Sequence, residues 1–204
     1  MEEFFTKMGI LWNLTEWLLT LLGVVFGLYL FLKDQIRRDR FFGFIPTVIT
    51  VVYDPKEKKV LVGHLNGGVN KWIFPQGRVE ESLLASARQV LSQELGLERS
   101  YKLLGSMYLG RTSLRREKTA RLDRFMDPAE FTLFRFWRGK AYTVLFVETK
   151  VESAMKELDA DFLYEDVQFV DLAEARDLLT AGHRNEKAQM YLNVLDALEK
   201  EMSK

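Results

Sequence analysis

The sequence predicts an α+β domain with a mixed sheet, preceded by one transmembrane α-helix. Residues 17–32 form an uncharged, apolar run near the start of the chain. The rest alternates between β-branched strand patterns and amphipathic helix patterns, without a regular βαβ repeat. A chain of 204 residues has room for one ordinary domain beside such a helix. We therefore place an anchor and a basic linker at residues 1–40 and the folded domain at residues 41–204.

The apolar run is long enough to cross a bilayer. A span needs about 20 mainly apolar residues at 1.5 Å each, and residues 14–33 supply that length. Trp17 and Tyr29 stand where interfacial aromatic side chains are expected. A cleaved signal peptide would begin with basic residues, whereas this chain begins with Glu2 and Glu3. We interpret the run as a retained single-pass anchor in the lipid bilayer.

Basic side chains predict the orientation of this anchor. Lys7 alone precedes the run, and four basic residues follow it: Lys33, Arg37, Arg38 and Arg40. The positive-inside rule then places the C-terminal domain in the cytoplasm, at the cell (inner) membrane. Gly23 and Gly27 form a small-xxx-small pair, which would let two such helices approach closely as a homo-oligomer.

Composition excludes several kinds of site. The chain has 29 basic and 29 acidic residues, so its net charge does not suggest a nucleic-acid binder. It has no cysteine, which excludes disulfides, thiol catalysis and thiolate metal sites. His64 and His183 are too few and too far apart to indicate a histidine metal cluster.

The folded domain begins with a predicted hairpin. Residues 44–53 and 59–65 are rich in β-branched side chains and flank a turn at Asp54 and Pro55. Ser82 is the expected N-cap of a helix over residues 82–95, which ends at Gly96. We predict further strands at 71–74, 101–109, 142–148 and 166–170, and further helices at 172–180 and 186–202.

Residues 72–97 carry the strongest motif and read WIFPQGRVEESLLASARQVLSQELGL. This stretch resembles the Nudix box, whose signature is Gly-x5-Glu-x7-Arg-Glu-U-x-Glu-Glu-x-Gly-U, with U aliphatic. The leading FPQG resembles the branch of the family that acts on dinucleoside polyphosphates and RNA 5′ ends. The resemblance covers about residues 44–200. It implies a Nudix-like α/β/α sandwich and a hydrolase of diphosphate bonds that uses Mg²⁺.

The match is incomplete where the family binds its metal. Gly77 takes the place of the leading glycine, with the following loop shortened by two residues. Glu81 and Glu94 match glutamates of the signature. At the remaining signature positions, Gln89 stands in place of the arginine, and Val90 and Gln93 stand in place of two glutamates.

These replacements remove two carboxylates from a helix face. Residues three and four apart on a helix are neighbours, so carboxylates at 90, 93 and 94 would together hold a hard divalent cation. Metal-assisted hydrolysis needs such cations to neutralise the reacting phosphate and to activate water. We interpret the box as degenerate, in a catalytically impaired pseudoenzyme with no cofactor, or with Mg²⁺ if catalysis survives.

Remnant site residues can still be named. Glu81 and Glu94 are the candidate catalytic residues, and Glu80, Glu81 and Glu94 the candidate weak metal ligands. The alternative is that these carboxylates merely solvate the helix end, where Glu80 and Glu81 would be favoured by its positive pole.

Basic and aromatic residues between the later strands form a candidate ligand site. Guanidinium groups and aromatic planes together suit a nucleobase and its phosphates. A solvated surface and an ordinary alternation of strand faces remain open as alternatives. The candidates are Arg111, Arg115, Arg116, Arg135, Trp137, Arg138 and Lys140.

Three functions are compatible with these patterns. The first is a membrane-anchored, impaired Nudix-like domain that binds a nucleotide or (cyclic) oligonucleotide; its layout resembles effectors of bacterial nucleotide-signalled antiphage defence. The second is an active, tethered Nudix hydrolase that holds Mg²⁺ through Glu80, Glu81, Glu94 and Glu165 or Asp166. The third is a structural adaptor with a vestigial cleft. The sequence identifies neither the ligand nor the oligomeric state.

Overall fold

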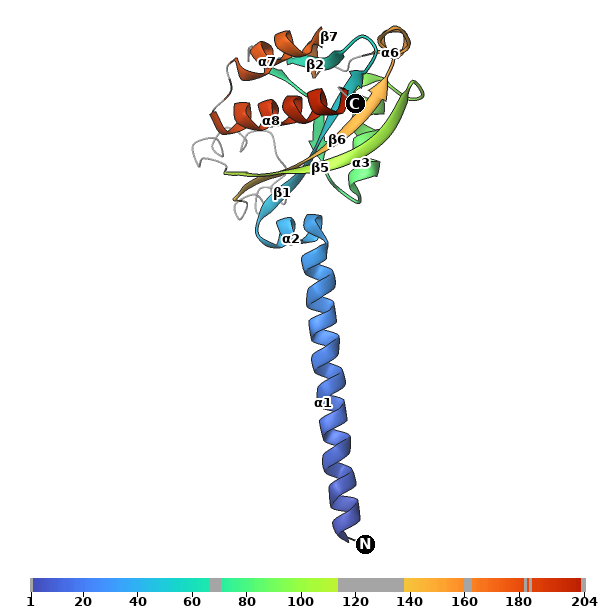
Figure 1. Ribbon diagram of the computed structural model, residues 1–204, viewed down its shortest axis with the longest axis vertical. Helices are drawn as coiled ribbons and strands as arrows, with labels where there is room; N and C mark the ends of the chain where they lie inside the picture. The colour runs from blue at the N-terminus through green and yellow to red at the C-terminus, as the bar shows by residue number, and fades with distance from the viewer. Residues whose placement is uncertain are drawn as a thin grey trace. The chain divides into compact units, whose positions relative to one another are not determined.

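The computed structural model describes residues 2–66, 71–113, 138–159, 163–181, 183 and 185–202. The chain divides into two compact units, Met1–Phe42 and Gly43–Lys204. The first unit contains helices α1 (Glu2–Lys33) and α2 (Gln35–Phe41), and the second contains a mixed sheet with its covering helices (Figure 1).

The first unit differs from the predicted single straight span. Among the residues that the structure describes, no single helix passes as a membrane span by length and composition, but the bent pair Thr15–Phe31 and Gln35–Phe41, at 95°, passes as a pair. The bend follows from Asp34, whose side chain accepts a hydrogen bond from the backbone N–H of Arg37 at 3.1 Å and so caps a new helix. The expected anchor over residues 14–33 is therefore replaced by a bent pair as the candidate.

The sheet of the second unit is built around two long parallel strands. Strand β1 (Phe44–Asp54) pairs in parallel with β6 (Gly139–Thr149), from Phe44 beside Gly139 to Tyr53 beside Glu148. The main strand order is β3-β2-β1-β6-β5, and β4 and β7 pair with β1 and β2. The other strands are β2 (Lys59–Leu65), β3 (Trp72–Ile73), β4 (Gln76–Arg78), β5 (Tyr101–Ser113) and β7 (Tyr164–Asp171).

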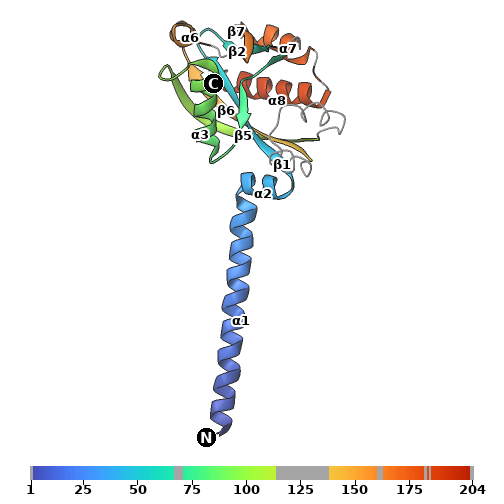
Figure 2. The same ribbon diagram turned by 180° about the vertical axis from the view of Figure 1, so that it is seen from behind.

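Helices cover the two faces of the sheet and give an α/β/α arrangement (Figures 1 and 2). They are α3 (Leu83–Gln89), the π-helix η1 (Val90–Glu94), α6 (Val151–Glu157), α7 (Leu172–Thr180) and α8 (Asn185–Met202). Arg176 of α7 binds Asp196 and Glu199 of α8, each at 2.8 Å, and so joins the last two helices. The core lies between sheet and helices, where Leu91, Leu195 and Leu198 are fully buried.

Several elements differ from their predicted bounds. The expected helix over residues 82–95 is split into α3 and η1, because the backbone widens to π-type hydrogen bonding from Val90 onward. Strands β5 and β6 pair antiparallel beyond their expected ends, from Tyr101 beside Thr149 to Ser113 beside Gly139. The short elements α2, β4 and α6 carry too few residues for a periodic pattern and were not predicted.

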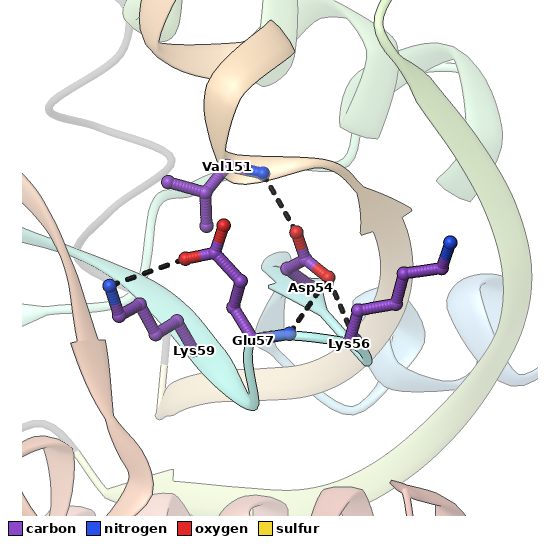
Figure 3. A network of polar contacts seen from close by, with 5 residues as sticks. All are labelled: Asp54, Lys56, Glu57, Lys59 and Val151. Carbon is purple, nitrogen blue, oxygen red and sulfur yellow. Dashed lines mark hydrogen bonds and ion pairs between the residues drawn. The ribbon is translucent and has the colours of Figure 1, made fainter.

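A buried carboxylate joins the first hairpin to the end of β6. Asp54 is 3% exposed. Its Oδ1 accepts hydrogen bonds from the backbone N–H groups of Lys56 and Glu57 at 2.8 and 3.3 Å, and its Oδ2 accepts one from Val151 at 2.9 Å (Figure 3). Burial by itself would raise the pKa of Asp54, but the three N–H donors lower it overall. The ionised form of Asp54 therefore stabilises the fold.

Replacing Asp54 by asparagine is expected to lower the free energy of unfolding by about 2 kcal/mol, because one charged acceptor is lost opposite the Val151 N–H. Since the native pKa of Asp54 is lowered, its stabilisation is complete above the pKa of the unfolded chain. It is lost as pH falls below about 4. Urea denaturation at pH 7 and pH 3 measures both effects. Glu57→Gln is the matched control, because its exposed ion pair with Lys59 is worth less than about 1 kcal/mol; an equal loss in both variants would contradict this account.

Candidate functional site

The loop that precedes α3 is fixed to the central strand β1. The carbonyl of Pro75 accepts hydrogen bonds from the backbone N–H and the hydroxyl of Thr50, at 2.8 and 3.0 Å. Gly77 of β4 lies beside Val48 of β1 in the antiparallel register. Ser82 caps α3 by accepting from the N–H of Ala85 at 3.2 Å, as expected. These bonds fix Pro75 and β4 to β1 and set the start of α3.

Val90 packs directly onto the backbone of Gly77. A methyl carbon placed on Gly77 would lie 2.5 Å from Cγ2 of Val90, so any side chain at this position would displace the valine. Val90 is only 4% exposed. The position at which the resembled family has a metal-binding glutamate is therefore occupied here by a buried hydrocarbon contact.

Glu94 is the carboxylate that remains beside this contact, and it has a protein partner. The hydroxyl of Tyr164 on β7 donates to Oε2 of Glu94 at 2.9 Å. The Tyr164 ring lies over Gly63, where an added methyl carbon would stand 2.5 Å from Cδ1 of the tyrosine. Burial, followed by the charge of Glu94, raises the pKa of Tyr164 far above its usual range. Tyr164 therefore stays protonated as a hydrogen-bond donor to Glu94.

The two other glutamates of the motif and the two glutamines of its helix lie on the exposed surface. Gln89 donates from Nε2 to Oε1 of Gln93 at 3.0 Å on the exposed side of the helix. Glu80 and Glu81 are exposed before α3 begins. Val90 is buried, Gln93 is exposed and Glu94 is half-buried. All three belong to the π-helical turn Val90–Glu94.

This donor set does not fit Mg²⁺. Within the described residues, no three histidine, cysteine, aspartate or glutamate side chains lie together in a way that could hold a metal ion. The structure does not bring Glu80, Glu81 and Glu94 into such a group. Glu165, a further candidate, lies with Oε2 3.1 Å from Nδ1 of His64. Mg²⁺ prefers six oxygen ligands in octahedral geometry, and a single tyrosine-bound carboxylate supplies little of that shell.

A second polar centre lies on the sheet face opposite Gly77. Gln76 precedes Gly77 in β4, so its side chain points to the other face. Its Oε1 is buried and has no hydrogen-bond partner in the described part of the chain, and the same is true of the Tyr191 hydroxyl of α8. Tyr191 is fully buried, and its ring meets those of Phe74 and His183 edge-on, each at 5.3 Å. Buried polar atoms without partners are rare, and each needs an explanation.

Electrostatics set this centre apart from an ordinary apolar core. Burial first, and then the neighbouring Tyr142, raises the pKa of Tyr191 well above its usual value. Tyr142 and Arg78 both lie beside Thr47 of β1 in the register of the sheet, one on each side. The protonated Tyr191 hydroxyl is therefore an available donor and acceptor near other polar side chains on this face.

The predicted basic residues are only partly described. Arg115, Arg116, Arg135 and Trp137 lie outside the described residues. Arg111 is exposed, and its guanidinium carbon lies 4.8 Å from the centre of the Phe44 ring. In the pairing of β5 with β6, Arg111 lies opposite Ala141, and Thr112 lies opposite Lys140. Since residues that lie opposite one another share a face and successive residues alternate, Lys140 and Arg111 point to opposite faces of the sheet. Arg138 is exposed and donates its backbone N–H to the carbonyl of Gly43 at 2.6 Å.

Several residues of the two polar centres were not predicted from the sequence. Tyr164 and Glu94 are 70 positions apart, so no local pattern connects them. Gly63 carried a signal, because a glycine within a strand often marks a close approach. Gln76 stood inside the quoted FPQG motif, but its unpaired oxygen depends on packing against distant elements.

The comparisons with known proteins agree with the fold. A family model described as the NUDIX domain matches residues 43–194. The E. coli dihydroneopterin triphosphate pyrophosphohydrolase superposes with a TM-score of 0.52 at 11% identity, over 76% of this chain and 98% of that one. The NUDIX domain of Shewanella oneidensis NrtR, complexed with ADP ribose, superposes with a TM-score of 0.50 at 13% identity, over 82% and 96%. No curated protein matches the sequence.

Proposed function

Because the chain belongs to the NUDIX domain family, we propose that it is a membrane-anchored member that binds a nucleotide or oligonucleotide without efficient hydrolysis. The main support for this proposal is Val90. Its side chain is buried against Gly77, at the position where the family signature has a metal-binding carboxylate. Glu94 is left as a single carboxylate, bound by Tyr164. A divalent cation that neutralises phosphate charge has too few ligands here, and hydrolysis loses its main source of stabilisation.

The binding half of the proposal rests on the unpaired atoms of Gln76 and Tyr191. A glutamine amide and a tyrosine hydroxyl are suited to the donor and acceptor edge of a nucleobase, and Phe74 beside Tyr191 offers an aromatic surface. Arg78 and Lys140 belong to the same sheet face through their register partners Thr47 and Ile45. Since Tyr191 is fully buried, ligand entry requires a small opening of α8.

A thermal-shift panel in EDTA tests this proposal. The panel contains nucleoside mono-, di- and triphosphates, dinucleoside polyphosphates, ADP-ribose and cyclic dinucleotides. We expect at least one of them to raise the melting temperature without metal, because a ligand that binds only the folded state stabilises it. A response that appears only with Mg²⁺ and is accompanied by product release would favour the tethered hydrolase. No response to any ligand would favour the adaptor.

Replacing Tyr191 by phenylalanine is expected to stabilise the free protein by about 1 kcal/mol while weakening the ligand-induced shift. The substitution removes a buried hydroxyl that has no partner in the described structure, and with it the cost of its desolvation. Tyr142→Phe is the matched control, because the Tyr142 hydroxyl is hydrogen-bonded to Thr112 and its loss should destabilise the protein. Chemical denaturation with and without the active ligand measures both quantities. A destabilised Tyr191→Phe protein with an unchanged ligand response would contradict the assignment.

The membrane half of the proposal rests on the bent pair of helices. Apolar side chains along α1 are 49–77% exposed from Trp17 to Leu30, which suits lipid contact. In this proposal the second unit is cytoplasmic, and ligand occupancy changes the assembly of the anchors, as an effector of nucleotide-signalled antiphage defence would require.

Retention in the membrane pellet after alkaline carbonate extraction tests the anchor. Growth arrest that depends on a co-expressed cyclic-oligonucleotide synthase tests the role.

A further inference from the structure

One face of the short helix α2 combines exposed basic and aromatic side chains. Arg37, Arg40 and Phe41 are spaced i, i+3 and i+4, so they share a face, and all three are exposed. The Arg37 side chain is 77% exposed and Phe41 is 73% exposed. Asp39, on another side of the helix, is 2% exposed. We call Arg37, Arg40 and Phe41 the basic-aromatic face.

This face is turned toward the end of the apolar helix α1. The Phe41 ring meets the Phe31 ring edge-on, with centroids 5.2 Å apart, and Phe42 continues the cluster at 5.5 Å from Phe41. Phe31 lies in the last turn of α1, just before the bend of 95°. If the bent pair anchors the chain with α1 inside the bilayer, Phe41 lies at the depth at which the apolar core gives way to headgroups.

We propose that α2 is an interfacial helix, which lies along the membrane surface and binds anionic phospholipid headgroups through its basic-aromatic face. This inference rests on the membrane anchoring proposed above. Aromatic rings favour the headgroup level, and guanidinium groups pair with lipid phosphates and are attracted to an anionic surface.

Charge selects lipid as the occupant of this face. A second copy of the chain would bring arginines against arginines, because Asp39 is the only acidic residue between Gln35 and Phe42 and it is buried. Asp34 already binds Arg37 at 3.0 Å and offsets only part of the positive charge. An anionic bilayer supplies negative charge to the exposed guanidinium groups of Arg37 and Arg40 as well as an apolar layer for Phe41.

The absence of cysteine allows a direct depth measurement. Full-length Phe41→Cys, Val25→Cys and Lys56→Cys variants are labelled with a nitroxide and reconstituted in vesicles of neutral phosphatidylcholine, with or without one quarter phosphatidylglycerol. Collisions with oxygen and with a water-soluble nickel complex report how deeply each label lies. Thermal unfolding of the second unit verifies that each variant is folded.

We expect the label at 25 to lie deep, the label at 56 to lie in water, and the label at 41 to lie about 5–10 Å below the surface. Phosphatidylglycerol should deepen the label at 41, and the added substitutions Arg37→Gln and Arg40→Gln should abolish this dependence. A deep label at 25 with a water-exposed label at 41 would overturn the interfacial helix and leave the anchor intact. An immersed label at 41 that ignores lipid charge would overturn the anionic preference. A water-exposed label at 25 would overturn both the anchor and this inference.

Discussion

Purified protein is expected to hydrolyse nucleoside diphosphate derivatives in Mg²⁺ at least about a thousandfold more slowly than an ordinary enzyme, whose kcat is typically about 10 s⁻¹. The physical reason is the loss of two carboxylate ligands for the cation at positions 90 and 93. A bound metal contributes several kcal/mol of charge stabilisation to the transition state, and each ~1.4 kcal/mol changes the rate tenfold. Here Val90 and Gln93 offer no negative charge, and Glu94 is already hydrogen-bonded to Tyr164.

Phosphate and nucleoside monophosphate release, followed by chromatography over hours, measures this rate. The Glu94→Gln variant is the control, because the slow residual rate should not depend on a carboxylate that holds no metal. Turnover near the ordinary rate that Glu94→Gln abolishes would show that the site binds its cation despite the replacements.

The chain with Val90→Glu and Gln93→Glu is expected to bind Mg²⁺ on the order of a hundredfold more tightly than the natural chain. Even the outer partners of metal ligands are worth ten- to a hundredfold in affinity, and this change adds two direct carboxylates next to Glu94. Gly77 leaves room beside position 90, since its lack of a side chain is what now accommodates the Val90 methyl group. Isothermal titration with Mg²⁺ and Mn²⁺ measures the gain.

Position 90 also carries the main risk to folding. Because Val90 is 4% exposed, a glutamate there is partly desolvated without its metal. The free variant should therefore melt at a lower temperature than the natural chain and regain stability when Mn²⁺ is added. Gln93→Glu alone, on the exposed side, is the matched control and should fold normally with a small gain in affinity. A folded double variant with unchanged metal affinity would contradict the placement of these positions.

Local sequence signals account for the correctly predicted elements. Helix α7 runs over Leu172–Thr180 as expected, because Asp171 caps it through the N–H of Glu174 at 2.8 Å. The first hairpin was also predicted, because Asp54 and Pro55 separate two β-branched runs. The side chain of Asp54 stabilises the turn by accepting hydrogen bonds from Lys56 and Glu57. The NUDIX domain was recognised because its loop–helix motif is continuous in the sequence.

The parts that the sequence did not predict depend on contacts between distant residues. The π-helical turn of Val90–Glu94 was expected as plain α-helix, because its residues have no local preference for the wider turn. The bond between Tyr164 and Glu94 forms only when β7 lies along β2. The bend between α1 and α2 was not predicted either. The residues after the apolar run were interpreted as a linker, and Asp34 was not identified as the N-cap of a second helix.

In the two polar centres, likewise, a residue was predicted where the local motif contained it, and contacts with distant residues were missed. Glu94 was named from the motif, but its bound state required Tyr164. The unpaired oxygens of Gln76 and Tyr191 belong to residues far apart in the sequence, in β4 and α8, and their burial depends on the packing of the folded domain. The sequence therefore named Glu94, and the structure added its partner Tyr164 and the unpaired atoms of Gln76 and Tyr191.

Calorimetric titration of the tightest nucleotide from the panel, performed once in EDTA and once in Mg²⁺, tests the central claim most directly. If binding relies on protein hydrogen bonds and arginine rather than on a cation, the two dissociation constants should agree within about threefold, a difference of less than ~1 kcal/mol. Binding that requires Mg²⁺, with a loss of a hundredfold or more in EDTA, would contradict this account.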